Sequence, residues 1–117
     1  MVVAIRAIPK SLLIHTVTYA KLLDADRWGT ESLKNQQVIK NVLIEPSSKL
    51  IRDKNNVEVQ LAATMFYDCR NSSPRGVVFK TDDIIIFNGE RFKVKICEPL
   101  YDERKLHHWE LGLVKHG

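Results

Sequence analysis

The residues best suited to metal chemistry in this sequence are the neighbouring pair His107 and His108. Adjacent residues of a β-strand point to opposite faces, so the two imidazoles are not expected to bind one metal ion together. A zinc site would need one of them to meet Cys69 or Cys97 in space, and no Cys-x-x-Cys or His-x-x-x-His spacing supports such a site. We therefore expect no metal site, and we interpret the pair as barrel-rim histidines near Trp109.

Two other pairs have the composition of catalytic groups, Asp82 with Asp83 and Ser72 with Ser73. Aspartates just before a strand commonly accept hydrogen bonds from the local backbone, which is the better interpretation of Asp82 and Asp83. The serines lack the context of a nucleophile elbow, and the five glycines are scattered rather than gathered in a phosphate-binding loop. The sequence thus predicts no catalytic residue, no cofactor and no enzymatic activity.

The positive charge leaves two interpretations open. A net charge of +4 permits contact with nucleic acid or an acidic protein surface but does not require either. Arg91, Lys93 and Lys95 alternate along one stretch, so they form a basic face that either meets solvent or contacts phosphates or an acidic neighbour. The same ambiguity holds for a second basic group in a polar segment, Lys49, Arg52 and Lys54.

The strongest structural signal is Asn88-Gly89, which lies between two apolar runs within residues 82–96. Both of these residues tolerate positive φ, as a type I′ turn requires, so the dipeptide predicts a β-hairpin. In the second arm, Phe92, Val94 and Ile96 are expected to share the buried face. The first arm is apolar throughout, so we expect it to be covered on both faces.

The remaining elements are read from β-branched and aromatic runs between turn signals, which predict strands over residues 11–19, 37–45, 57–69 and 106–115. Residues 77–80 are interpreted as a short strand or an approach to the hairpin. The 57–69 strand is long enough that a bend or bulge is expected. Residues 20–36 and 46–57 are predicted loops. About six strands without a long helix indicate an all-β barrel or sandwich. We favour a small antiparallel β-barrel spanning 1–117 as one domain, because closure removes exposed edges.

The cysteines and the start of the chain indicate a cytoplasmic site of synthesis. Cys69 and Cys97 lie in apolar runs, so we expect reduced core thiols rather than a disulfide. The apolar residues 1–9 are too short for a signal peptide, and no segment is long enough to span a membrane.

Five segments also carry a family resemblance: residues 8–15 (IPKSLLIH), 26–29 (DRWG), 44–49 (IEPSSK), 65–69 (MFYDC) and 98–110 (EPLYDERKLHHWE). Together they resemble the minor capsid proteins of tailed bacteriophages and of prophages in Gram-positive hosts. The resemblance covers nearly the whole chain. It depends on the length of the chain and on the order and amino-acid sequence of these segments rather than on a catalytic motif.

The resemblance implies a place in the virion neck. The chain is similar in plan to head-completion (stopper) proteins of siphophage head–tail connectors, which are small β-barrels that form rings, commonly twelve-fold, around the DNA channel. The implied partners are further copies of the chain, portal or adaptor proteins, tail proteins and packaged double-stranded DNA held by non-specific contact. The protein would be made in the bacterial host cytoplasm.

By its position in the fold, the loop between the second and third strands would reach into the channel and help to retain DNA. We expect it to be poorly ordered in the isolated subunit. The residues of this predicted channel loop are Ser47, Ser48, Lys49, Leu50, Ile51, Arg52, Asp53, Lys54, Asn55 and Asn56.

A ring also needs two different and complementary patches on each subunit. The candidates for these patches are Arg27 and Trp28, in a predicted loop, and Arg75, in the 71–76 turn. Two interpretations of Trp28 stay open: it packs on its own domain, or it anchors an interface. Two alternatives stay open: a monomeric nucleic-acid-binding barrel of the OB type, and an adaptor or tail-terminator ring at a neighbouring position in the neck.

Overall fold

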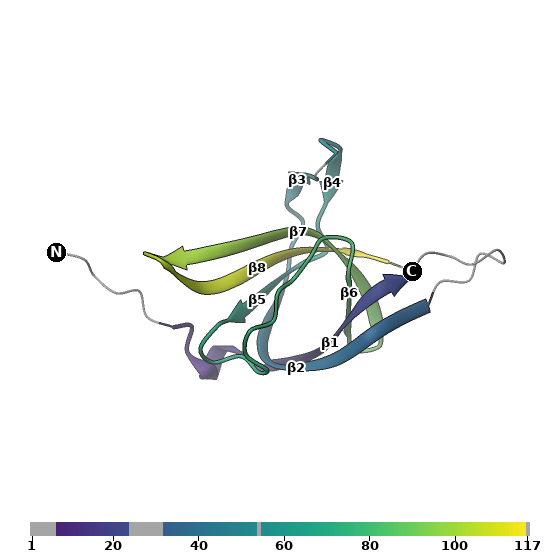
Figure 1. The fold of residues 1–117 in the computed structure, drawn as a ribbon. Helices are drawn as coiled ribbons and strands as arrows, with labels where there is room; N and C mark the ends of the chain where they lie inside the picture. The colour runs from purple at the N-terminus through teal and green to yellow at the C-terminus, as the bar shows by residue number, and fades with distance from the viewer. Residues whose placement is uncertain (1–6, 24–31, 54, 117) are drawn as a thin grey trace.

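A ring of six antiparallel strands forms the body of the molecule (Figure 1). The computed structural model describes residues 7–23, 32–53 and 55–116. The order around the ring is β1-β2-β5-β8-β7-β6, and β1 closes it by pairing Thr18–Ala20 with Ile84–Ile86 of β6. The predicted all-β barrel is therefore confirmed. The strands of the ring are β1 (His15–Leu23), β2 (Ser32–Pro46), β5 (Ala63–Asp68), β6 (Ile84–Phe87), β7 (Glu90–Asp102) and β8 (Lys105–Lys115).

The barrel interior is filled by alternate side chains of these strands. The most completely buried apolar ones are Ile39, Val42, Met65, Tyr67, Ile85, Val94, Leu111 and Leu113. Ile84 is equally buried, but as the neighbour of Ile85 it lies on the opposite face of β6. Residues 77–80 do not form a strand, but they deliver Val77 and Phe79 to the same core. The Phe79 ring centroid lies 4.9 Å from that of Tyr19, 5.1 Å from that of Tyr67 and 5.6 Å from that of Trp109. One irregular segment therefore links three walls of the barrel through aromatic contacts.

The hairpin around Asn88-Gly89 forms as predicted, with φ of 51° and 77° at the two turn residues and β6 paired to β7. Phe92 and Val94 are buried, but a register shift between Val94 and Ile96 changes the faces that follow. The expectation that Ile96 shares the buried face is wrong because the bulge at this shift moves Ile96 to the outer surface, against Gly112. Cys97 packs on the core instead.

The chain before and after the first predicted loop differs from expectation. Residues 10–12 form a short 3-10 helix, η1 (Lys10–Leu12), so the first strand starts at His15 rather than at residue 11. β1 then continues to Leu23 and β2 starts at Ser32, which makes the predicted 20–36 loop too long. A two-stranded ribbon exposes both faces, so it accommodates the polar residues that suggested a loop. β2 has left-handed residues at Asn35, within this ribbon, and at Asn41, at a register shift in the barrel.

The predicted 57–69 strand is broken at Leu61 and Ala62, which agrees with the expected bend. Its first part, β4 (Glu58–Gln60), pairs with β3 (Leu50–Arg52) to form a separate two-stranded sheet. Its second part is β5 of the barrel. Within the described residues, no helix is long and apolar enough to cross a membrane.

Candidate functional site

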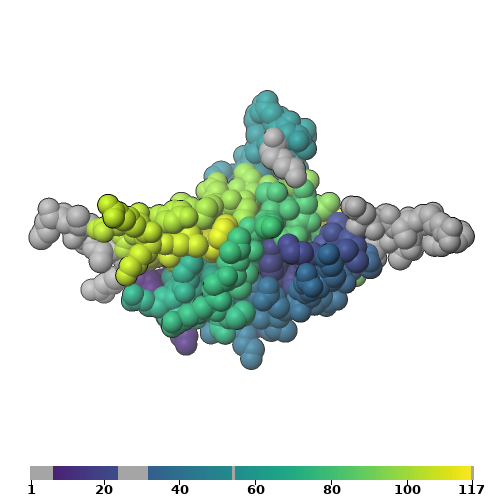
Figure 2. Space-filling model, viewed as in Figure 1, coloured from purple at the N-terminus to yellow at the C-terminus, as the bar shows by residue number. Residues whose placement is uncertain are grey.

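The segment predicted to be an irregular channel loop is a hydrogen-bonded hairpin that stands clear of the barrel (Figures 1 and 2). Leu50 pairs with Gln60 and Arg52 with Glu58. At the tip, Asp53 Oδ1 accepts hydrogen bonds from the N–H groups of Asn55, at 2.9 Å, and Val57, at 3.0 Å. An aspartate that caps its own turn fixes the local backbone. The segment is therefore a hairpin with paired strands rather than an irregular loop, and poor order of this segment in the isolated subunit stays a prediction.

The outer side of this hairpin is polar and carries charges of both signs, since Glu58 is exposed opposite Arg52, and it has two apolar exceptions. Lys49 and Arg52 are exposed, and Arg52 Nη1 donates a hydrogen bond to the carbonyl of Asn56 at 3.0 Å. Leu50 and Val57 are 60% and 56% exposed. Of the ten predicted channel residues, Lys54 lies outside the described part of the chain. The hairpin thus presents cationic and apolar side chains together, a combination suited to contact with DNA phosphates or with a neighbouring protein.

The base of the hairpin is fixed to the barrel by the backbone and by one leucine. The Leu61 N–H donates to the Lys49 carbonyl at 2.9 Å, and the Ala62 N–H donates to the Leu113 carbonyl of β8 at 2.8 Å. Leu61 is 6% exposed and packs on the outer face of β8 above Gly112. A Cβ atom at Gly112 would lie 3.1 and 3.2 Å from the two Leu61 methyl groups and 3.4 Å from Ile96 Cβ. We call Leu61, Ile96 and Gly112 the hairpin seat.

The predicted basic face is divided in the structure. Arg91 is exposed and Lys93 half-buried on the outer surface of β7. Lys95 lies at the register shift of that strand and lines a small cavity of about 80 Å³ between the 81–82 turn and Asp53 of the hairpin tip. The structure therefore places Lys95 beside the hairpin, whereas the function of all three cations stays a prediction.

The residues assigned to subunit patches fall in two places. Arg27 and Trp28 lie outside the described residues. Arg75 is exposed and borders a cavity of about 380 Å³, together with Arg70, Lys105 and Asp102, between the 69–76 loop and the far end of the β7–β8 ribbon. Its role in an interface stays a prediction.

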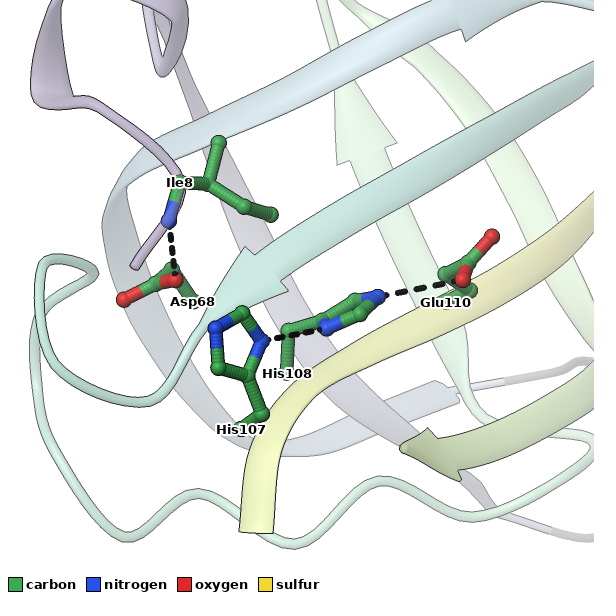
Figure 3. Close-up of polar contacts among 5 residues, drawn as sticks. All are labelled: Ile8, Asp68, His107, His108 and Glu110. Carbon is green, nitrogen blue, oxygen red and sulfur yellow. Dashed lines mark hydrogen bonds and ion pairs between the residues drawn. The ribbon is translucent and has the colours of Figure 1, made fainter. Parts of the chain in front are cut away.

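A buried carboxylate at the end of β5, which the sequence did not single out, holds the start of the described chain (Figure 3). Asp68 is fully buried, and its Oδ2 accepts a hydrogen bond from the Ile8 N–H at 2.7 Å. Its Oδ1 accepts from the N–H groups of Arg70 and Asn71, both at 2.9 Å. Asn71 Nδ2 in turn donates to the Ile8 carbonyl at 2.7 Å. The polar residues after Asp68 predicted a turn at 71–76. No local pattern indicated that Asp68 binds Ile8, which is 60 residues away in the sequence.

The expectation that His107 and His108 point apart is wrong. A register shift between Leu100 and Tyr101 of β7 leaves an extra residue on β8, and this bulge brings the two imidazoles together. Their Nδ1 atoms are 2.8 Å apart, and His108 Nε2 lies 3.1 Å from Glu110 Oε2 (Figure 3). No group of three or more His, Cys, Asp or Glu side chains in the described residues is arranged to hold a metal ion.

The remaining candidate groups, Asp83 and the two cysteines, have structural roles in the described part of the chain. Tyr19 donates a hydrogen bond to Asp83, and Lys21 Nζ lies 3.6 Å from the same carboxylate. Burial and this carboxylate raise the pKa of Tyr19. Cys69 and Cys97 are free thiols, and burial raises the pKa of both, that of Cys97 to about 11. Raised pKa values disfavour the reactive thiolate, so these cysteines are suited to packing rather than to nucleophilic chemistry.

Comparison with models of protein families gives a match over most of the chain. The family model for minor capsid proteins matches residues 9–113, which include the whole barrel except its last residues and the entire hairpin. A search of curated proteins found no similar sequence.

Proposed function

Because the chain belongs to the minor capsid protein family of phages, we propose that it is a head–tail connector subunit of the head-completion, or stopper, type. Family membership makes it a structural component of the virion. The proposal adds a position, the neck, and an assembly, a ring of copies that surrounds the DNA channel and joins the portal or adaptor to the tail.

The observation that carries this proposal is the β3–β4 hairpin. It projects from a closed barrel, it has a fixed base, and it exposes Lys49 and Arg52. A channel element needs no base-specific contacts, because phosphates attract lysine and arginine whatever the sequence. A small number of such cations also suits DNA that must later leave through the same channel. In this proposal the hairpin points into the channel and the barrel forms the ring wall.

Cryo-electron microscopy of the virion neck tests the position. We expect this chain as a ring between portal and tail with the β3–β4 hairpins directed at the axis. A location elsewhere in the virion would refute the connector role, and a ring one position above or below would instead identify an adaptor or a tail terminator. Tight, salt-sensitive binding of short oligonucleotides by a lone monomer, without portal association, would favour the OB-type alternative.

A deletion tests the hairpin itself. Removing Lys49 to Asn55 takes away β3 and the carbonyl that accepts the Leu61 N–H, but it retains Leu61 itself, the Ala62–Leu113 hydrogen bond and all six barrel strands. We expect heads that fill and then lose DNA. The matched control is the double substitution Arg91→Ala and Lys93→Ala, which removes two cations from the barrel wall and should leave DNA retention unchanged. Normal retention in the deletion would show that the hairpin does not close the channel.

A further inference from the structure

The barrel has an open, apolar end that its own described side chains do not fill. A cavity of about 460 Å³ lies there, within the size range of sites that bury small ligands or a few side chains. Its lining comes from the starts of β1, β5 and β7 and the ends of β2, β6 and β8, so it is the mouth of the barrel. The lining residues are His15, Ile44, Pro46, Ala62, Ala63, Phe87, Asn88, Glu90, Phe92 and Lys115.

The mouth combines an apolar floor with a polar rim. Ile44, Ala63 and Phe92 are buried and form part of the floor, next to the ring of Phe87. His15 is already engaged, since its Nδ1 accepts the Ile44 N–H at 3.0 Å and its ring packs edge-on against Phe87 at 4.9 Å. Such a cup suits an apolar peptide segment rather than a charged ligand.

The sequence contains one segment of this chemistry outside the described residues. Met1 to Ile5 are all apolar and include three β-branched residues, and Arg6 follows them. Burying such a run in an apolar cup is favoured by the hydrophobic effect. Arg6 would then lie at the rim, where the Glu90 side chain is 59% exposed and, among the described residues, forms a long ion pair with Lys115 Nζ at 3.9 Å.

The position at which Ile8 is bound determines whether residues 1–5 can reach the barrel mouth of their own subunit or that of a neighbouring one. Ile8 is bound to Asp68 at one end of β5, whereas Ala63, at the other end of that strand, lines the mouth. The five residue steps between them span roughly 17 Å at about 3.3 Å each. Six fully extended residues reach at most about 20 to 22 Å. The packed core bars a direct route, so the segment would use nearly all of its length in reaching its own rim.

We propose that the barrel mouth of one subunit receives residues Met1 to Ile5 of a neighbouring copy. The donor end, at Asp68, and the acceptor end, at the mouth, are different surfaces of the same molecule, because they lie at opposite ends of β5. Their contact is heterologous and closes into a ring when the rotation between copies permits. This inference rests on the proposed ring, and it names the contact that joins its subunits.

Cysteine pairing in the full-length protein tests the exchange. Val3→Cys and Asn88→Cys are made in separate chains, which are mixed, assembled and mildly oxidised. We expect disulfide-linked dimers of one chain of each kind, identified by mass. Wild-type protein is the control for Cys69 and Cys97, whose burial and raised pKa values slow their oxidation. A chain that carries both substitutions should give linked multimers, and a predominant internal link within a monomer would overturn the proposal.

The second test blocks the barrel mouth with a large side chain. Ala62→Trp places a bulky side chain in the cavity, and Ser32→Trp is the matched control at the exposed start of β2. We expect loss of the linked dimer only with Ala62→Trp, while circular dichroism shows both chains folded. Rings that form without any Val3–Asn88 link would refute the exchange and leave the connector function standing. A chain that forms no ring in the virion would refute the connector function itself.

Discussion

The hairpin seat gives the sharpest test of how the candidate channel element is held. A side chain at Gly112 of β8 would crowd Leu61, because its Cβ would lie 3.1 and 3.2 Å from the Leu61 methyl groups. The perturbation is Gly112→Ala, made alone and together with Leu61→Ala. The prediction is that the two substitutions are strongly non-additive.

The magnitudes follow from opposing effects. Overpacking costs about 1 to 3 kcal/mol, whereas replacing a strand glycine by alanine gains about 0.5 to 1 kcal/mol, so Gly112→Ala should destabilise by about 1 kcal/mol. Leu61→Ala should cost about 2 kcal/mol, the low end for a buried leucine, because the surface site can collapse. With Leu61 truncated the collision is absent, so Gly112→Ala should then stabilise. The expected coupling free energy is about 2 kcal/mol.

Two measurements check this. Urea unfolding of the four proteins gives the free energies of the double-mutant cycle. Hydrogen exchange of the hairpin amides shows where the change acts, and exchange at the β3–β4 pairs should accelerate in Leu61→Ala while the barrel amides stay protected. Additive free energies would refute the seat. So would an equal loss of protection throughout the barrel, because the hairpin would then have no local anchorage of its own.

Three further predictions concern the barrel. Burial raises the pKa of the Cys97 thiol from 9.0 to about 11. On raising the pH, the thiol therefore ionises first in the unfolded chain. The stability that the neutral thiol contributes is fully present below pH 9 and is lost as the pH rises towards 11. Thermal unfolding should show a smaller loss of stability at alkaline pH in Cys97→Ala than in the wild-type protein. Asp68→Asn keeps one acceptor oxygen but replaces the other with an NH2 group, which cannot accept a backbone N–H, so the substitution should cost about 1 to 3 kcal/mol and speed hydrogen exchange at Ile8; unchanged exchange would contradict the clamp. Gly89→Ala should cost about 1 to 2 kcal/mol by urea unfolding, because φ is 77° there and no neighbouring atom hinders the new methyl group.

The parts of the fold that the sequence predicted well are those with local causes. Asn88-Gly89 specifies its turn through two residues that tolerate positive φ, and the flanking apolar runs specify the strands. The barrel class followed from the number of such runs. The alternation of apolar and polar residues predicted the wrong face where a strand contains an extra residue. The bulges near Lys95 and His107 reverse the alternation, so the orientations expected for Ile96, Cys97 and the histidine pair are wrong.

The sequence predicted where the hairpin lies in the chain, but not that it is a paired two-stranded element. Pro46 and the polar residues after it marked a connection between two strands, and β3 and β4 are too short and too charged to show a strand pattern. The seat beneath them is a contact between Leu61 and Gly112, which are far apart in sequence, so only the register of β5 against β8 reveals it. The Asp68 clamp on Ile8 escaped prediction for the same reason.

The hairpin enters and leaves the barrel at adjacent points, because Pro46 pairs with Ala63 and the Ser47 N–H donates to the Ala62 carbonyl at 3.1 Å. A direct turn could connect β2 and β5 there, so the hairpin is an insertion whose length the barrel does not constrain. Each residue added to both of its strands would extend it by about 3.3 Å. In a ring of the proposed kind, the aperture could therefore evolve separately from the circumference: insertions and deletions in one short stretch would set the bore, and the contacts between barrels would set the number of subunits.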